Sequence, residues 1–444
     1  MRKPSEVLNS CIYRSRLQFA MACGWLLGFL TSATFAQPPK TDGTEKSFTE
    51  ELRQHFQEAV SEKLVTDHFL TQRSKSFGTL SADTPEALRT KYETAFSSFR
   101  DAVWKVQKVF IQHQVAWSPE QDLQRLKQYG QLLNAAQAQL DVWRDVIAEV
   151  YVASPTNSES LGEIIGEMIE NGAKRDMFEG LIPMARAMMD KNIELPSSII
   201  EAIGYIGYAN NDYALAEAAW TRLGTTETLS NVVTSLLRTL SEQRIKWAQE
   251  IARREADAAR DDNPQVEILT NKGRIVVELF EEEAPQAVAN FIFLAEQRFY
   301  HKKMFFRVIE HFAAQTGCEK SDGTGDAGYT IRSETSAPNH RNVFRGSLVL
   351  LSGIHEQTKL PNPDSGSSQI FFAMLPLPKF DGQMTVFGRV IEGLPILGTL
   401  QRVDFSNEKE RKDKSKRADL IIDVKVLRKR NHEYIPEVAS GRLP

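Results

Sequence analysis

The chain has 444 residues, of which 41% are hydrophobic and 25% are charged, and 24 of them are Phe. This length and composition can bury more than one apolar core, which excludes an intrinsically disordered protein and favours at least two domains. The formal net charge is -4. The basic residues are spread along the chain rather than gathered on one predicted face, so the sequence argues against a nucleic-acid partner.

The first 36 residues have the pattern of an export signal. Basic residues precede an apolar run at 17–30, and small residues at 34–36 offer a cleavage site before Gln37. The apolar stretch is also about long enough to span a bilayer, so a cleaved signal and a retained membrane anchor both remain open. We predict an exported, periplasmic bacterial protein with no membrane contact beyond such an anchor. Residues 37–47 are predicted to be a polar linker.

Residues 48–260 are predicted to form an all-α domain, because apolar residues recur there at three- and four-residue spacing. Around 161–224, Gly204 and Trp220 belong to a pattern that resembles a tetratricopeptide helix pair, in which small residues permit close approach and an aromatic fills the gap. A stable array needs about three repeats, and one copy is convincing. A helical hairpin domain is therefore the main prediction, with a peptide-binding repeat as the alternative. The charged helix 241–260 is predicted to be a solvated connector.

Beyond Pro264 the pattern changes to strands. Apolar segments at 266–270 and 274–280 flank a Gly-containing turn, which is typical of a β-hairpin. Helices are predicted at 284–295 and around 394–401, with short strands and Gly-rich turns between them. Many short strands with two isolated helices predict a closed β-barrel with helical lids.

Two apolar segments of this barrel carry residues that could form one pocket. Arg307, Phe312 and Gln315 lie on the first segment, and Phe371 lies on the second. An apolar pocket with one charged donor suits a proline ring and the tertiary amide that precedes it. An Arg among Phe, Val and Ile is costly unless it is paired or functional. The alternatives are barrel core for the Phe residues, a structural ion pair for Arg307, and a surface role for Gln315.

Residues 265–428 resemble the cyclophilin-type peptidyl-prolyl cis-trans isomerase family over the whole expected domain. The order and spacing of several short motifs carry the resemblance: Ala284-Pro285-x-Ala287-Val288-x-Asn290-Phe291, Phe306-Arg307-Val308-Ile309, Gly366-Ser367-Ser368-Gln369-Ile370-Phe371-Phe372, and Phe380-Asp381-Gly382. The resemblance implies an eight-stranded antiparallel β-barrel capped by two helices. The predicted fold class is therefore multidomain α + β, with the all-α domain first and this barrel second. The tail 429–444 carries no interpretable motif.

The resemblance also implies an activity and roles for individual residues. The chain would be a peptidyl-prolyl cis-trans isomerase that acts on X-Pro bonds of exported, unfolded or flexible polypeptides and serves as a folding factor. Arg307 would stabilise the twisted amide, and Gln315 would hold the substrate backbone. Phe312, Phe371 and Phe380 would bind the proline ring. No metal or cofactor is implied. Six further positions would contact substrate: Ala313, Met384, Leu351, Ser352, Gly323 and Thr324.

Several positions depart from the family pattern, including Leu351-Ser352 where Ala-Asn is usual, and three of them are single residues. Ala313 stands where a Met usually lines the pocket, Lys379 stands at a position that is often Trp, and Met384 stands at a common His position. We hypothesise that Met384 refills the volume lost at Ala313, since Met adapts to irregular gaps. Two alternatives to an active isomerase remain: a weakly active or inactive proline-peptide binding module, and a chaperone or scaffold whose helical domain binds clients or a protein partner.

Overall fold

The computed structural model describes only part of the chain, namely residues 85–115, most of 132–151, 159–190, 194–225, 228–353, 362–413 and 415–443. The expected export signal, the linker and the start of the helical domain lie outside the described residues. The chain divides into two compact units, residues 1–169 with 183–194 and residues 170–182 with 195–444. Among the helices that the structure describes, none is both long and apolar enough to cross a membrane.

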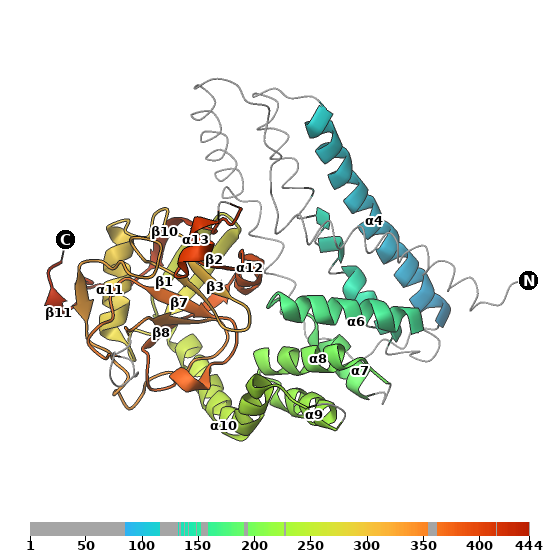
Figure 1. Cartoon of the computed structure of the whole chain (residues 1–444), viewed down its shortest axis with the longest axis horizontal. Coiled ribbons are helices and arrows are strands. Elements are labelled where there is room, and N and C mark those ends of the chain that lie inside the picture. The colour runs from blue at the N-terminus through green and yellow to red at the C-terminus, as the bar shows by residue number, and fades with distance from the viewer. Residues whose placement is uncertain are drawn as a thin grey trace, which may run out of the picture. The chain divides into compact units, whose positions relative to one another are not determined.

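The described residues before 261 are helical, as the apolar spacing predicts (Figure 1). In the first unit, Phe99 packs on the fully buried Trp143 with ring centroids 5.3 Å apart. The helices of this region are α4 (Pro85–Val115), α6 (Glu159–Lys174), α7 (Ile182–Asp190), α8 (Ser197–Ala209), α9 (Tyr213–Gly224) and α10 (Asn231–Arg260).

Helices α8 and α9 form the close pair that the sequence predicts. A Cβ at Gly204 would lie 1.9 Å from Nε1 of Trp220, so only glycine fits at this crossing. The Trp220 side chain is fully buried, and its Nε1 donates to the carbonyl oxygen of Glu201 at 3.3 Å. Asp212 begins α9, where its side chain accepts from the Leu215 amide. A repeat array built from such pairs stays a prediction.

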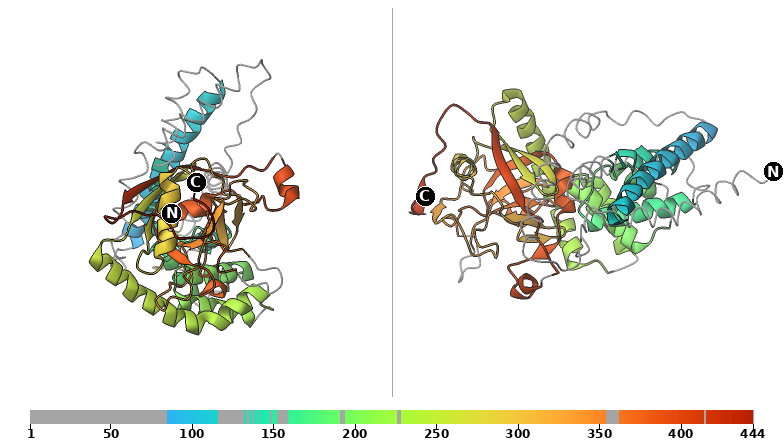
Figure 2. Two further views of the ribbon diagram at one scale, coloured as in Figure 1. Left: turned by 90° about the vertical axis from the view of Figure 1, so that its left-hand side faces the viewer. Right: turned by 90° about the horizontal axis from the view of Figure 1, so that it is seen from above.

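Within the described residues, nine strands form one antiparallel sheet in the order β10-β1-β2-β8-β6-β7-β4-β3-β9. The sheet is curled, as the expected barrel requires (Figure 2). Backbone hydrogen bonds from 302–305 to 419–421, each 2.8–2.9 Å, link the segment before β3 to the start of β10. The strands are β1 (Gln265–Thr270), β2 (Gly273–Leu279), β3 (Arg307–Ile309), β4 (Ala313–Thr316), β6 (Ser347–Leu350), β7 (Ile370–Ala373), β8 (Val386–Glu392), β9 (Val403–Asp404) and β10 (Ile421–Arg428).

The expected count of eight strands is exceeded by one because the two-residue strand β9 pairs with β3. Helices α11 (Pro285–Glu296) and α12 (Leu394–Thr399) stand where the sequence predicts them, and both contribute to the apolar core of the barrel. The tail adds β11 (Val438–Gly441), which pairs with β5 (Tyr329–Ile331). No local pattern in the tail predicts this strand. Two short helical segments complete the barrel, η2 (Pro378–Phe380) and α13 (Glu408–Lys412).

The barrel strands alternate between two apolar clusters. Val308, Ala314 and Phe372 face the interior, where they pack with Phe291 of α11. The intervening residues of the same strands face outward. Phe371 and Ala313 belong to a separate apolar cluster there, the outer cluster. This alternation follows from the two-residue period of a β-strand. It places the predicted pocket residues on the outer face of the sheet.

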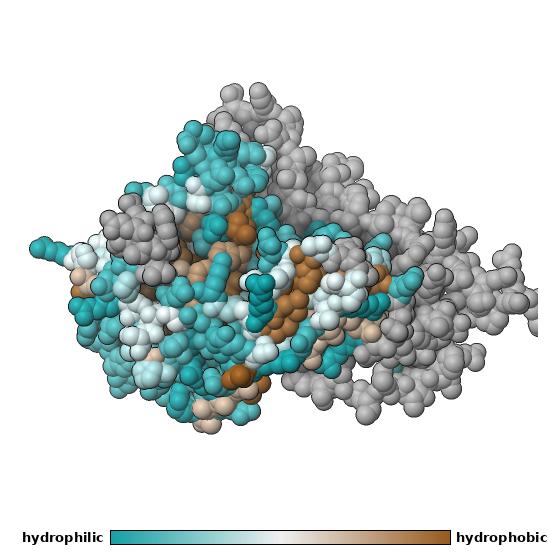
Figure 3. All heavy atoms as spheres, turned by 60° about the horizontal axis from the view of Figure 1, so that its bottom comes forward, coloured by the Kyte–Doolittle hydropathy of each residue, from teal (hydrophilic) through white to brown (hydrophobic). Residues whose placement is uncertain are grey.

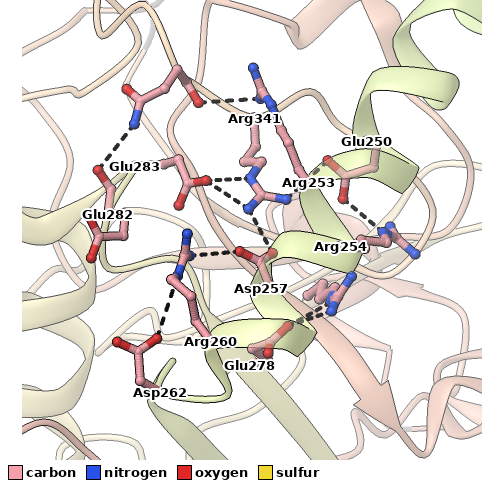
Figure 4. A network of polar contacts seen from close by, with 12 residues as sticks. Glu250, Arg253, Arg254, Asp257, Arg260, Asp262, Glu278, Glu282, Glu283 and Arg341 are labelled. Carbon is pink, nitrogen blue, oxygen red and sulfur yellow. Dashed lines mark hydrogen bonds and ion pairs between the residues drawn. The ribbon is translucent and has the colours of Figure 1, made fainter.

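Helix α10 packs on the barrel through an ionic network rather than lying free as a solvated connector. Arg341 of the barrel is 1% exposed and contacts Asp257 of α10 at 2.7 Å, Glu250 of α10 at 3.3 Å and Glu283 at 2.7 Å (Figure 4). Buried charges are tolerated when they are paired in this way. The prediction of a solvated connector is therefore wrong for this face of α10, because sequence spacing alone cannot identify a partner for its carboxylates.

Val232 and Ile245 of α10 are exposed to solvent. The surface of the described residues in Figure 3 is mostly hydrophilic, with separate apolar areas. Exposed apolar side chains of this kind are ordinary on folded domains.

Candidate active site

The predicted catalytic residues lie in one row across the sheet. Arg307 of β3 pairs with Gln315 of β4, and Gln315 pairs with Phe371 of β7. Directly paired residues of antiparallel strands point to the same face. The row continues to Val349 of β6 and ends on the other side at Asp404 of β9, which pairs with Arg307. Residues far apart in sequence thus share one face of the sheet.

The residues predicted to bind the proline ring gather around Phe371 of this row. Phe371 is buried in the outer cluster, and Phe312 and Phe380 pack against it while remaining partly exposed. The Phe380 ring lies 5.9 Å from the Phe312 ring and 6.0 Å from the Phe371 ring, measured between centroids. These rings belong to the outer cluster and not to the barrel interior. Phe371 is 2% exposed within that cluster, and proline binding by the three rings stays a prediction.

Two of the departures from the family pattern, Ala313 and Met384, fall in the same cluster. Ala313 is fully buried and Met384 is 4% exposed, and both belong to the apolar group around Phe371. Their shared location is compatible with the hypothesis that Met384 supplies volume that Ala313 lacks. Leu351 packs half-buried against this group, and the neighbouring Ser352 is buried.

Arg307 is held by an acidic residue that sequence reasoning missed. Its Nε donates to Oδ2 of Asp404 at 3.2 Å, and its side chain remains 31% exposed. The predicted alternative of an ion pair is thus present, but it engages one of the five N–H donors of the guanidinium. Gln315 is 7% exposed, which excludes a mere surface role. No local sequence motif marks Asp404, and only the folded structure shows its pairing with Arg307.

The Asp404 carboxyl is more acidic than an ordinary one. Burial raises its pKa, but hydrogen bonds from Ser406 and Arg307 and the charge of Arg307 outweigh that effect, so the pKa lies below the ordinary value of 3.8. Asp404 is therefore ionised at neutral pH and holds the guanidinium from one side.

Two cations lie over the rim of the aromatic pocket. The guanidinium of Arg307 lies 5.6 Å from the centroid of the Phe312 ring. The exposed Lys379 places Nζ 4.8 Å from the centroids of both Phe312 and Phe380. Cations in such positions are attracted by the aromatic quadrupole. Lys379 therefore covers part of the pocket edge and adds positive charge to it.

The loop that carries the predicted contact residues Gly323 and Thr324 is held by the side chain of Gln369. The Gln369 side chain donates to the carbonyl oxygens of Gly323 at 3.0 Å and Gly325 at 2.8 Å. Gln369 lies two residues before Phe371 and so faces the same side of its extended segment. The loop is thus tied to the site by Gln369 rather than by the aromatic cluster. Gln369 belongs to a recognised motif, but the sequence assigned it no role.

Comparison with known proteins identifies the barrel. Residues 265–426 match the family described as cyclophilin type peptidyl-prolyl cis-trans isomerase. A peptidyl-prolyl cis-trans isomerase of Helicobacter pylori is 42% identical over 139 residues, which cover 31% of this chain and 80% of the relative. Peptidyl-prolyl cis-trans isomerase B of Bacillus subtilis is 38% identical over 141 residues, which cover 32% of this chain and 92% of the relative.

A solved structure is also similar, that of a Cryptosporidium parvum cyclophilin type peptidyl-prolyl cis-trans isomerase in the presence of the dipeptide Ala-Pro. It is 27% identical, and the match covers 36% of this chain and 98% of that chain with a TM-score of 0.31. The identity and coverage of the bacterial relatives decide the classification. The chain belongs to the cyclophilin type peptidyl-prolyl cis-trans isomerase family, and its enzyme class is that of a peptidyl-prolyl cis-trans isomerase.

Proposed function

We propose that this enzyme isomerises X-Pro bonds of exported polypeptides at the outer face of β3, β4 and β7, as a folding factor. One observation carries the proposal: Arg307, Gln315 and Phe371 are cross-strand neighbours in a single row. The row places a cation, an amide and an aromatic ring on one face beside the partly exposed Phe312 and Phe380. This combination suits a proline ring joined to a polar backbone.

The chemistry requires no covalent intermediate. Rotation about a prolyl amide crosses roughly 18–20 kcal/mol, because resonance is lost when the bond is twisted. The prolyl nitrogen then becomes pyramidal and gains a usable lone pair. A donor directed at this nitrogen binds the twisted state more tightly than either planar state, which is the condition for catalysis.

Arg307 is the proposed donor. Its Nε is engaged by Asp404, which fixes the guanidinium and leaves its terminal N–H groups for substrate. A hydrogen bond from a charged group contributes about 1.5–3 kcal/mol, and about 1.4 kcal/mol corresponds to a tenfold change in rate. Arg307 alone therefore accounts for roughly a ten- to hundredfold acceleration.

The remaining residues hold the substrate while the bond turns. In this proposal the Gln315 amide binds a substrate backbone carbonyl, and Phe312, Phe371 and Phe380 bury the proline ring. Burial of the ring fixes one side of the amide so that the other side rotates. Ala313, Met384, Leu351 and Ser352 shape the walls, and the loop of Gly323 and Thr324 lies further along the site.

The test is direct measurement of cis-to-trans relaxation of a proline tetrapeptide with the full chain and with Arg307→Ala. We expect acceleration by the full chain and at least a tenfold loss of kcat/KM in the variant. Arg389→Ala is the control, because Arg389 pairs with Glu278 on the same sheet at 2.7 Å but lies outside the row. Unchanged kcat/KM in Arg307→Ala would contradict the proposed role. Absence of acceleration by a folded wild-type chain would instead favour a proline-peptide binding module.

Export and periplasmic location are a separate part of the proposal, supported by the pattern of the first 36 residues. Fractionation of a bacterial host that expresses the full chain, with determination of the mature N-terminus, tests it. A product that begins at Gln37 in the periplasm would support a cleaved signal. An intact chain in the membrane fraction would support an anchor, and an intact chain in the cytoplasm would contradict export.

A further inference from the structure

Two loops border the proposed proline pocket, and each is bound by a residue that lies before the barrel in sequence. His311 immediately precedes Phe312, and Asp381 immediately follows Phe380. Asp176 contacts His311, and Lys246 contacts Asp381. All four of these polar residues belong to the compact unit that contains the barrel. Two segments of this unit that precede the barrel, the turn after α6 and helix α10, therefore contact both loops.

The contact at His311 uses the backbone as well as the side chain. Its N–H donates to Oδ1 of Asp176 at 3.0 Å, and its Nδ1 lies 2.8 Å from the same oxygen. Because a carboxylate oxygen accepts, this contact places a proton on Nδ1. The Tyr205 ring stacks on the imidazole at a centroid distance of 4.3 Å, and Nε2 lies 3.5 Å from Oε1 of Glu310. His311 is thus fixed from several directions.

These contacts hold the His311 backbone in a conformation that it would not prefer by itself. His311 has a φ of 55°, in the left-handed region that residues other than glycine seldom adopt. It lies in the turn between β3, which carries Arg307, and β4, which carries Gln315. Strained residues persist when surrounding contacts hold them, and such residues cluster at active sites. Asp176 supplies two of those contacts.

Asp176 also contacts the segment that leads into β9, the strand of Asp404. Nη2 of Arg402 donates to Oδ2 of Asp176 at 2.7 Å, and Arg402 directly precedes β9, whose Asp404 is the partner of Arg307. The Asp176 side chain is fully buried. One carboxylate therefore joins the two segments that lie on either side of the Arg307 strand.

The close approach of Asp176 depends on a glycine of the barrel. A Cβ at Gly398 would lie 2.7 Å from Cγ of Met177 and 2.8 Å from the carbonyl oxygen of Arg175. Gly398 lies in α12, so only a residue without a side chain lets segment 170–182 reach the barrel at this point. The contact of Asp176 is thus part of the packing and not a long side chain lying on a surface.

The second contact fixes the loop that carries Phe380. Lys246 of α10 donates from Nζ to Oδ2 of Asp381 at 2.8 Å, and the Val343 amide donates to Oδ1 at 2.8 Å. Burial raises the pKa of the Asp381 carboxyl, whereas the ammonium of Lys246 and the amide of Val343 act to lower it. Asp381 therefore depends on Lys246 for its charge partner.

We propose that Asp176 and Lys246 are positioning residues of the isomerase site, holding the turn before Phe312 and the loop after Phe380. The inference rests on the proposed function and extends it, since it assigns a catalytic task to helical elements outside the matched family region. Lys246 positions only the proline pocket. Asp176 positions the ring pocket and, through Arg402, the strand that holds Arg307.

The two contacts predict different kinetic effects in the full chain, measured on a proline tetrapeptide with kcat and KM resolved separately. Lys246→Gln raises KM several-fold and leaves kcat near the wild-type value, because only ring binding is loosened. Asp176→Asn raises KM and also lowers kcat, for a loss of about tenfold or more in kcat/KM.

Each variant has a matched control in the same segment. Lys174→Gln removes the exposed ion pair of segment 170–182 between Lys174 and Glu170, which is 2.7 Å long. Glu242→Gln removes the more exposed partner of Lys246 and leaves Asp381 in place. Both controls are expected to keep kcat and KM within about twofold of wild type, while urea unfolding reports their stability.

A rescue variant separates positioning from simple destabilisation. In the double variant Lys246→Gln with Asp381→Asn, two amides replace the ion pair, so a hydrogen bond can form without a buried unpaired carboxylate. We expect the double variant to reverse most of the rise in KM that Lys246→Gln causes. If Asp176→Asn fails to fold, the Lys246 series still decides the proposal.

The proposal is overturned if each variant matches its control in both kcat and KM, or if activity falls only in proportion to the folded fraction. These outcomes presuppose a wild-type chain that accelerates isomerisation and loses activity in Arg307→Ala. A wild-type chain without activity contradicts the proposed function itself, so the two failures are distinguishable.

Discussion

Asp404 binds Arg307 from the side opposite to Gln315, with Nε of the guanidinium 3.2 Å from Oδ2 of the carboxylate. The pair is formed by the two-residue strand β9 and the short strand β3. Its consequence is orientation, because one edge of the planar guanidinium is fixed and the remaining donors are directed elsewhere. The stability and the activity of the barrel should therefore both depend on Asp404.

Asp404→Asn tests this dependence through pH. The pKa of Asp404 in the folded chain lies below the ordinary value of 3.8, so ionisation of this group favours folding. The stabilisation is fully present above that value and is lost as the pH falls through the lower folded pKa. The difference in unfolding free energy between wild type and Asp404→Asn should shrink as the pH is lowered from about 7 to about 3.

Asp423→Asn is the control for this series, since Asp423 is half-exposed and lies 4.0 Å from its cation. Its effect on stability should be small throughout the pH range. At neutral pH, Asp404→Asn should also lower kcat/KM while Asp423→Asn does not. Equal pH dependence in the two variants would contradict the assignment to Asp404.

Ala313 and Met384 should compensate for each other in the pocket cluster. Ala313→Met overpacks a fully buried position and is expected to cost about 1–3 kcal/mol. Met384→Ala removes a side chain that is 4% exposed and is expected to cost about 2–5 kcal/mol and to weaken proline binding. The double variant should cost less than the sum of the single variants.

Denaturant unfolding of the four chains measures this coupling, and peptide binding measures the pocket. Additive costs would show that Met384 does not occupy the volume next to Ala313. The hypothesis of volume compensation would then be rejected, although both residues would remain in the apolar cluster.

Arg341 should be the most sensitive residue of the contact between α10 and the barrel. Arg341→Met leaves Asp257 and Glu283 buried without their main partner, which is expected to cost about 3–5 kcal/mol. Lys412→Met breaks a pair with Glu408 in which both side chains are more than half exposed, and should cost less than about 1 kcal/mol. Thermal unfolding of both variants compares them, and similar small losses would mean that the Arg341 network contributes little.

Gly204→Ala should destabilise the α8–α9 pair even though alanine is the better helix former. In an isolated helix the change would gain about 1 kcal/mol, but here the new methyl group would overlap Trp220. We expect a net loss of about 1–3 kcal/mol in the free energy of unfolding. Tryptophan fluorescence during denaturant unfolding measures this loss. Gly224→Ala is the matched control, because its nearest neighbour is a flexible Leu229 side chain at 3.4 Å. A stabilising Gly204→Ala would contradict the packing at this crossing.

Much of the barrel could be predicted from the sequence because its signals are local. The hairpin of β1 and β2 follows from alternating apolar residues around a Gly turn, and α11 follows from an apolar run that begins with a Pro. Ordered motifs added the identity of the pocket residues. The strand β11 was missed because its short exposed segment has no apolar alternation, and it forms by pairing with β5.

The residues that frame the site could not be predicted in the same way. Asp404, Asp176 and Lys246 stand in segments without a motif, and their roles come from partners distant in sequence. A carboxylate in a charged segment is predicted to be solvated unless its partner is known. The charged helix 241–260 illustrates this, because Asp257 is buried against Arg341 of the barrel.

The sequence by itself determined the family and the barrel, because spacing and local motifs encode strands, and it supplied the residues that we propose to face the substrate. Tertiary structure alone decided what holds those residues in place. Arg307 is fixed by Asp404 of β9, the turn of His311 by Asp176, and the Phe380 loop by Lys246. The physical reason is that ion pairs and hydrogen bonds depend on distances of a few ångströms, and only the folded chain brings such distant residues that close.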